Sequence, residues 1–138
     1  MLFYLNGCCL LPFKPKGKKV KMKVTAYCAC QKCSGWERDC WSCWLQPVYA
    51  AGRSKGRPKV VGITSDGTNA DHGTIAADIK YYPYGTRMYI EGYGWGTVHD
   101  TGGAIKGRNH IDLFFDDHEE ALKWGVKTLM VTVIKPGK

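Results

Sequence analysis

Short runs rich in β-branched and aromatic residues, each ended by a turn, constrain the fold of this chain more than any other feature of its sequence. The turns carry Gly, Pro, Asn or Asp, as in Ser65-Asp66-Gly67-Thr68. Partial alternation of polar and apolar residues marks the first run as a half-buried strand. Strands are expected over residues 19–27, 60–64, 74–77, 87–91, 96–99, 110–115 and 128–134. The chain is therefore expected to be mainly β.

One helix is expected, just before the last strand. It begins near Asp116 or Asp117, since either carboxylate can accept hydrogen bonds from the free amides of a first turn. Glu119 favours the same end through the helix dipole, and Gly125 is a preferred terminator. Because a closed sheet has no exposed edges, a small barrel of six or seven strands with this one helix is favoured over an open sheet.

The charge of the chain is basic and uneven. A length of 138 residues allows one domain, and the net charge is +8. Lysines concentrate between Lys14 and Lys23, and a second basic cluster lies at residues 53–59. Such clusters attract polyanions, but a solvated arm and a solvated loop are the favoured interpretation. No recognisable nucleic-acid-binding motif accompanies them, so no nucleic-acid partner is expected.

Residues 1–18 are expected to be an apolar and then basic leader or arm, ahead of a domain at residues 19–135. The apolar part, residues 1–13, is shorter than the roughly 20 residues of a membrane-spanning helix. It also lacks the basic start of a secretory signal. Leu5-Asn6-Gly7-Cys8 resembles the end of a lipoprotein signal, so lipidation of Cys8 and membrane association are one expectation, and a disordered leader is the other.

Cysteines crowd into an insertion at residues 28–43. Cys30-x-x-Cys33 and Cys40-x-x-Cys43 have the paired spacing of a four-thiolate zinc or iron–sulfur site, although the gap between the pairs is short. In an exported protein the same thiols would form disulfides instead. Both alternatives stay open. Either way the cluster is expected to be structural, because no histidine lies nearby in the sequence to activate a thiol.

Two acids flank a glycine-rich loop in the second half of the chain. Asp100-Thr101-Gly102-Gly103-Ala104-Ile105-Lys106-Gly107 is followed closely by His110-Ile111-Asp112, and each acid adjoins an apolar run. A turn between these runs can bring both carboxylates to one cleft, which is how many polysaccharide-cleaving sites are built. The alternative for each aspartate is a turn-capping role beside glycine.

These two motifs belong to a series that resembles the 3D domain, which is named for three aspartates. The other members of the series are Gly62-Ile63-Thr64-Ser65-Asp66-Gly67-Thr68, Thr74-Ile75-Ala76-Ala77-Asp78 and Tyr84-Gly85-Thr86-Arg87-Met88-Tyr89-Ile90. The domain occurs in wall-acting proteins of bacteria and phages, and at the C-terminus of the membrane-bound lytic transglycosylase A family. The resemblance runs from about residue 25 to residue 134. It places the three aspartates at Asp78, Asp100 and Asp112. Arg108-Asn109 lengthens one loop relative to the usual pattern, and the cysteine-rich insertion also exceeds the simplest members.

The resemblance implies a double-psi β-barrel whose cleft binds glycan strands of peptidoglycan. It implies a lytic transglycosylase that cleaves the MurNAc–GlcNAc bond, forms 1,6-anhydro-MurNAc and needs no cofactor for catalysis. Asp112 would be the acid/base, with Asp100 and Asp78 in support. Candidate substrate contacts are the hydroxyls, loop glycines, cation and aromatic ring of Thr64, Ser65, Thr68, Gly102, Gly103, Lys106 and Tyr84.

Such an enzyme can use a single acid, because the C6 hydroxyl of the substrate is the nucleophile. Asp112 must then begin protonated near neutral pH. Its apolar neighbours and the like charge of Asp100 would raise its pKa, whereas a nearby Lys106 would lower it.

Two rival functions remain open at this stage. One is an expansin-like wall-binding module that does not cut the glycan, and the other is a structural or tail-associated phage protein. The expected location is the cell envelope or the extracellular space, meaning periplasm, outer membrane or wall, or else a phage particle. A monomer is expected.

Overall fold

The expected strands pair into a closed barrel in the computed structural model, which describes residues 15–38 and 46–137. Its six strands follow the order β1-β7-β4-β6-β5-β8 around the barrel. Their bounds are β1 (Lys18–Tyr27), β4 (Thr74–Ala77), β5 (Arg87–Ile90), β6 (Gly94–Asp100), β7 (His110–Phe114) and β8 (Lys127–Ile134). The predicted fold class, a small closed β-barrel with one short helix before the last strand, is confirmed.

Alternation of side chains along the strands builds the core of this barrel. Met22 and Val24 of β1 and Ile111 and Leu113 of β7 are fully buried, each pair separated by one residue that is not. Successive side chains of a strand point to opposite faces, so two apolar residues with this spacing both enter the interior. Burial of each such side chain is worth about 1.5 to 3 kcal/mol, which makes apolar packing the main stabilisation of the barrel.

The pairing of the strands places the two acids of the glycine-rich motif on either side of one small residue. Ala76 of β4 pairs with Asp112 on antiparallel β7 and with Asp100 on parallel β6, where the register shifts at a bulge. Neighbouring strands lie about 4.8 Å apart, so the two acidic residues are separated by about two strand spacings. On the far side of β7, the parallel strand β1 pairs Thr25 with Asp112.

The helix before β8 forms as the sequence predicts. It is α2 (His118–Trp124), and the side chain of its N-cap residue Asp117 accepts a hydrogen bond from the amide of Glu120 at 3.2 Å. Gly125 follows its last residue. Ala121 and Trp124 are buried. Among the described residues, no helix combines the length and the apolar character that crossing a bilayer requires.

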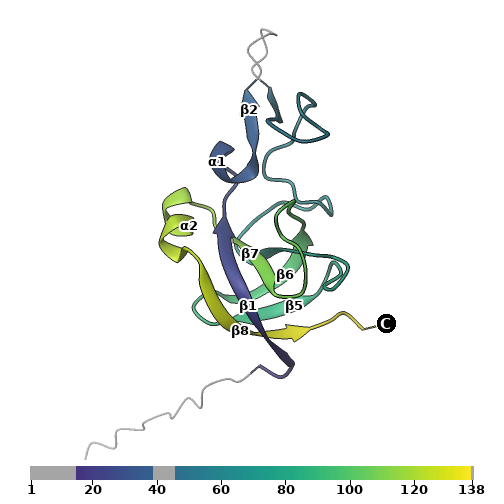
Figure 1. The fold of residues 1–138 in the computed structure, drawn as a ribbon, viewed down its shortest axis with the longest axis vertical. Helices are drawn as coiled ribbons and strands as arrows, with labels where there is room; N and C mark the ends of the chain where they lie inside the picture. The colour runs from purple at the N-terminus through teal and green to yellow at the C-terminus, as the bar shows by residue number, and fades with distance from the viewer. Residues whose placement is uncertain (1–14, 39–45, 138) are drawn as a thin grey trace, which may run out of the picture.

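Two expectations about the first half of the chain were wrong. Residues 60–64 do not form a strand but turns, with an isolated bridge between Ile63 and Asn69. Gly62 has a φ of 81°, which ends any extended run there. The cysteine-rich segment also contains a second short helix, α1 (Gln31–Ser34), and a two-stranded sheet of β2 (Trp36–Arg38) and β3 (Pro47–Tyr49) that stands apart from the barrel (Figure 1).

Candidate functional site

A cleft of about 850 Å³ lies between one end of the barrel and the cysteine-rich segment. The barrel contributes Tyr27, Ala76, Asp100, Asp112 and Phe114 to its lining. The segment before β4 contributes the opposite wall, which includes Ala29, Cys33, Ser34, Gly35, Tyr49 and Lys59. The cleft therefore has one wall made by the barrel and one made by the cysteine-rich segment and the chain that follows it.

Asp112 occupies the barrel wall in a setting that favours the protonated carboxyl. Its pKa is raised to about 6, mainly by burial and to a smaller extent by the negative charge of Asp100. A hydrogen bond from the Thr25 hydroxyl, 2.9 Å from Asp112 Oδ1, opposes these effects without cancelling them. Thr25 reaches this carboxyl because the parallel register of β1 and β7 places it beside Asp112. The aspartate can thus hold a proton close to neutral pH.

Asp100 has the opposite surroundings, because four donors converge on its two oxygens. The Tyr27 hydroxyl donates to Oδ2 at 2.8 Å. The amide and hydroxyl of Ser65 donate to Oδ1 at 3.0 and 2.6 Å, and the amide of Thr101 at 2.8 Å. A carboxyl that only accepts hydrogen bonds is an ionised one. The cleft therefore presents one proton-holding acid and one fixed carboxylate.

The turn at residues 64–68 holds Ser65 against Asp100. The carboxylate of Asp66 accepts hydrogen bonds from the hydroxyls of Thr64 and Thr68, both at 2.7 Å, and contacts Nδ1 of His99 at 2.5 Å. Burial raises the pKa of Asp66, but these bonds outweigh burial and hold that pKa below its usual range. The Asp66 amide also donates to the carbonyl of His99 on β6. The turn is thus tied to the strand that ends in Asp100.

Asp78 lies outside the lining of the cleft, and its bonds are those of a loop anchor. The amide of Gly107 donates to Asp78 Oδ2 at 2.9 Å, and the amide of Lys80 donates to Oδ1 at 3.1 Å. The Gly107 bond is the main reason that the pKa of Asp78 is lowered, and the Lys80 bond and the charge of Lys106 act in the same direction. Asp78 therefore fastens the far end of the glycine-rich loop.

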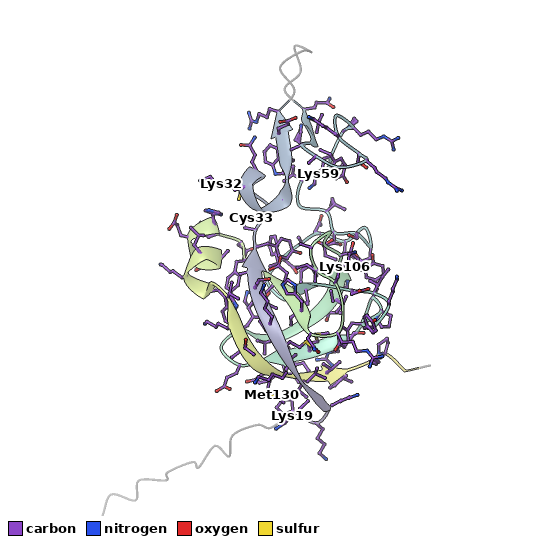
Figure 2. The ribbon with its side chains drawn as sticks, in the orientation of Figure 1. Lys19, Lys32, Cys33, Lys59, Lys106 and Met130 are labelled. Carbon is purple, nitrogen blue, oxygen red and sulfur yellow. The ribbon has the colours of Figure 1, made fainter. Side chains whose placement is uncertain are left out.

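The other predicted substrate contacts divide between the cleft and its surroundings. Thr64, Ser65, Gly102 and Gly103 line it, whereas Thr68, Tyr84 and Lys106 are not among its lining residues. Lys106 is exposed on the loop beside the barrel (Figure 2). Gly102 is required for steric reasons, because a Cβ there would come within 2.6 Å of Ile105 Cγ1.

His110 belongs to the hydrogen-bonded group around Asp112, and His99 does not. His110 Nε2 lies 3.2 Å from the Thr25 hydroxyl, which is the same hydroxyl that contacts Asp112. Burial, and then the nearby charge of Lys23, lowers the pKa of His110. A neutral imidazole next to Thr25 can accept as well as donate a hydrogen bond.

The cysteines gather differently from the predicted pairs. Cys30 and Cys33 lie with Cys28 and His118, and the ligand atoms of all four residues lie within 4.8 Å of one another. The other half of the predicted set, Cys40 and Cys43, lies outside the described residues, as does Cys8.

Several residues of the site were not found from the sequence. Thr25 and Tyr27 contact the two acids from β1, and their signal was the alternation that puts both on one face of that strand. Which strand lies beside β1 could not be deduced from that pattern. Lys59 brings a cation into the cleft, donates from Nζ to the Ser34 carbonyl, and has a pKa lowered by burial. Its basic cluster had indicated only a solvated loop or a polyanion contact.

Comparison with known proteins agrees with this geometry. Residues 73–135 match the model of the 3D domain, a stretch that contains β4 to β8 and all three aspartates of the motif. "Cell wall-binding protein YocH" of Bacillus subtilis (strain 168) is 44% identical over 79 residues, which cover 54% of this chain and 27% of that protein. "Putative cell wall shaping protein YabE" of the same organism is 39% identical over 77 residues, which cover 53% of this chain and 19% of that protein.

The matched region thus spans about a quarter of one relative and a fifth of the other. The stretch that matches the family model, residues 73–135, includes the strands that carry Asp100 and Asp112, the loop between them and the helix that follows. The barrel topology and the order of the motifs agree with the same assignment. The part of the chain that matches the 3D domain family is therefore residues 73–135.

Proposed function

We propose that this protein acts on the bacterial cell wall, and that its cleft binds glycan strands of peptidoglycan and cleaves them as a lytic transglycosylase. The observation that carries the proposal is the pairing of a proton-holding Asp112 with an acceptor-only Asp100 across Ala76 in one cleft. The match of residues 73–135 to the 3D domain and the wall-related names of the two relatives support the substrate class and a location at the envelope or wall.

In the first step, protonated Asp112 transfers its proton to the glycosidic oxygen as the bond from that oxygen to C1 of the muramic acid breaks. Positive charge then develops on the sugar ring. The C6 hydroxyl of the same sugar attacks C1, and ionised Asp112 takes the hydroxyl proton. The products are a free hydroxyl on the leaving sugar and a 1,6-anhydro ring, and no water is consumed. Asp112 returns to its protonated state.

Asp100 supports both steps without forming a bond to the sugar. A carboxylate held by Tyr27, Ser65 and Thr101 cannot rotate away, so its charge faces the cleft throughout the reaction. That charge stabilises the oxocarbenium-like sugar and also favours the proton on Asp112. Both roles require the carboxylate of Asp100 to stay in place, which is what its four hydrogen bonds ensure.

The Thr25 hydroxyl can form a hydrogen bond with Asp112 in both protonation states of the carboxyl. When Asp112 is ionised, the Thr25 hydroxyl donates to it at 2.9 Å. When Asp112 is protonated, the carboxyl can donate to the Thr25 oxygen, and that hydroxyl can turn to His110 Nε2, which is 3.2 Å away. Both protonation states of Asp112 therefore have a hydrogen-bond partner.

The opposite wall supplies groups suited to a muramic acid strand. Sugar rings bind to flat apolar faces with polar groups beside them, and Tyr49 provides such a ring. The ammonium of Lys59 lies 5.0 Å from the centre of this ring, close enough for a carboxylate on the substrate to reach both. We assign the binding of a substrate carboxylate to Lys59 rather than to Lys106, the cation among the substrate contacts expected from the sequence.

A wall-binding module without catalysis is the second candidate, and the name of one relative, "Cell wall-binding protein YocH", favours it. The two candidates are separated by mass spectrometry of the soluble products released from purified peptidoglycan. The wild-type protein is compared with Asp112→Asn and with Asp116→Asn, an exposed acid just beyond β7. We expect anhydro-muropeptides from the wild type and from Asp116→Asn, and none from Asp112→Asn. Sedimentation of the protein with intact wall but no soluble product would support the binding module. Products with reducing ends would indicate hydrolysis instead.

A further inference from the structure

Three cysteine sulfurs converge on one histidine nitrogen beside the cleft. Nδ1 of His118 lies 3.6 Å from Sγ of Cys28, 3.3 Å from Sγ of Cys30 and 3.5 Å from Sγ of Cys33. The four ligand atoms all lie within 4.8 Å of one another. Figure 2 shows Cys33 at α1, between the barrel and β2.

Hydrogen bonding alone does not explain this arrangement. A ring nitrogen either carries one proton or has one lone pair, so it can make one good hydrogen bond and not three. A tetrahedral zinc ion explains all three distances. With Zn–S of about 2.3 Å and Zn–N of about 2.0 to 2.1 Å, the sulfur and nitrogen ligands stand about 3.6 Å apart. The observed separations of 3.3 to 3.6 Å agree with that value.

We propose that Cys28, Cys30, Cys33 and His118 bind one Zn²⁺ as a structural site. All four positions of the tetrahedron are filled by protein atoms, which is the arrangement of a structural zinc and leaves no position for a substrate or water. The site is independent of the function proposed above, because none of its ligands takes part in the chemistry at Asp112.

The barrel brings these four ligands together through one parallel pair of strands. β1 and β7 end side by side at the pair Tyr27 and Phe114. Cys28 is the first residue after β1. His118 lies four residues after Phe114, the last residue of β7, and is the first residue of α2. Because parallel strands end at the same edge of a sheet, the two departing segments begin as neighbours. The metal would join them.

The local structure around Cys30 places two of the sulfurs together. Cys30 is the N-cap residue of α1, so Cys33 lies one turn along. Both sulfurs lie close to Nδ1 of His118, at 3.3 Å for Cys30 and 3.5 Å for Cys33. Gly35 then reverses the chain in the left-handed conformation with φ of 57°, and the Ser34 hydroxyl donates to the Cys28 carbonyl at 2.6 Å.

This site would fix one wall of the cleft. Ala29, Cys33, Ser34 and Gly35 line the cleft. Cys33 is one of the proposed ligands, and Ala29 and Ser34 are each next to a ligand in the sequence. α1 has no buried residues that could hold this wall through apolar packing. The proposed zinc supplies that attachment, one residue away from Tyr27 and its hydrogen bond to Asp100.

The first test measures metal in the full chain, purified without chelator. Elemental mass spectrometry is expected to find about one zinc per chain. Cobalt exchanged into the protein should give the visible spectrum of a tetrahedral site with three thiolates and one nitrogen. Cys30→Ser and His118→Ala should each lower retained zinc at least tenfold, whereas His72→Ala, a histidine outside the cluster, should retain it.

The second test distinguishes this site from the paired Cys-x-x-Cys alternative. Cys40→Ser and Cys43→Ser should bind zinc as the wild type does. His118→Cys should keep the metal and move the cobalt spectrum toward four thiolates, which tests the ligand set in a variant that still offers four ligands.

Four results would overturn the proposal. They are a folded chain that carries no zinc and takes up none when zinc is added, iron in place of zinc, a disulfide within residues 28–33, or zinc lost in Cys40→Ser or Cys43→Ser but retained in His118→Ala.

Discussion

The two walls of the cleft are stabilised in different ways. The barrel wall is continuous with a core in which Ile75, Ile111 and Leu113 are fully buried. Among its described residues, the wall formed by the cysteine-rich segment has few buried side chains, with Cys28 and Val48 as examples. Hydrogen bonds and the proposed zinc would hold it instead. One wall of this cleft is thus stabilised by the core of the barrel, and the other would be stabilised by a bound metal ion.

Removal of zinc should have the largest effect and should separate the two walls. Metal binding supplies about 10 to 16 kcal/mol in small zinc domains, and the segment here has little apolar burial to replace it. We expect chelation to accelerate amide exchange by more than a hundredfold in residues 28–38, while β4 to β7 stay protected. Hydrogen exchange with mass spectrometry measures both regions at once. Equal loss of protection in the two regions would show that one cooperative unit contains both walls.

Truncation in the core should instead destabilise the whole barrel. Leu113 is fully buried, so Leu113→Ala should lower the free energy of unfolding by about 2 to 5 kcal/mol through lost burial and an unfilled cavity. Leu122 on α2 is 60% exposed, and Leu122→Ala serves as the matched control with a change below about 1 kcal/mol. Denaturation by urea gives both values. Zinc content should remain unchanged in the folded Leu113→Ala protein.

The sequence predicted the barrel wall better than the opposite wall, for a physical reason. Residues 74–77 and the cap at Asp117 have local signals, namely β-branched residues in the strand and a side chain able to cap a helix. Such signals depend on neighbours within a few residues. The expected strand at 60–64 failed because a closed barrel offers no free edge for it and Gly62 breaks the extended run.

The candidate site depends on contacts between distant residues, which one sequence does not reveal. His118 is 85 residues or more from each of its cysteine partners, and Thr25 is 87 residues from Asp112. The family motifs placed the acids at Asp100 and Asp112 without indicating these contacts. A search for metal ligands near the cysteines therefore favoured Cys40 and Cys43 and missed His118.

The raised pKa of Asp112 predicts that Asp112→Asn loses activity but gains stability. Its pKa is 3.8 in an unfolded chain and about 6 in the native protein, so the native state binds this proton more tightly. The resulting stabilisation is fully present below pH 3.8 and is lost as pH rises through about 6. Asp112→Asn should therefore be more stable than the wild type by up to about 3 kcal/mol at pH 7 to 8, with the difference shrinking toward pH 4.

The rate of glycan cleavage should fall as pH rises through the pKa of Asp112. Because the acid must start protonated, the rate should fall about tenfold per pH unit above about 6. Product release measured between pH 5 and 8, together with thermal melting of both proteins, tests the assignment. A flat pH profile, or a variant less stable than the wild type at pH 8, would contradict it.

Loss of the Tyr27 hydroxyl should have a smaller effect at the junction of the two walls. Tyr27→Phe removes one of four donors to Asp100 and leaves the ring packed on Phe114, with ring centres 5.4 Å apart. A hydrogen bond to a charged group contributes about 1.5 to 3 kcal/mol, so we expect a ten- to hundredfold fall in glycan cleavage with zinc content unchanged. Tyr89→Phe, on β5 and away from the cleft lining, is the control. A loss of zinc in Tyr27→Phe would mean that the metal site and the acid pair cannot be separated.

Lys59 should show the smallest effect, and it tests whether the wall outside the barrel binds substrate or only encloses it. The ammonium lines the cleft and donates to the Ser34 carbonyl, so it is already held in place when a substrate carboxylate arrives. One partly solvated charge contributes about 1 kcal/mol, so Lys59→Gln should weaken binding of an acidic muropeptide about fivefold, measured by calorimetry at low salt. Lys106→Gln, outside the cleft lining, should bind normally. If Lys106→Gln weakens binding and Lys59→Gln does not, the glycine-rich loop is the carboxylate-binding side. The wall formed by the cysteine-rich segment would then only shape the cleft, and the barrel with its glycine-rich loop would bind the substrate carboxylate.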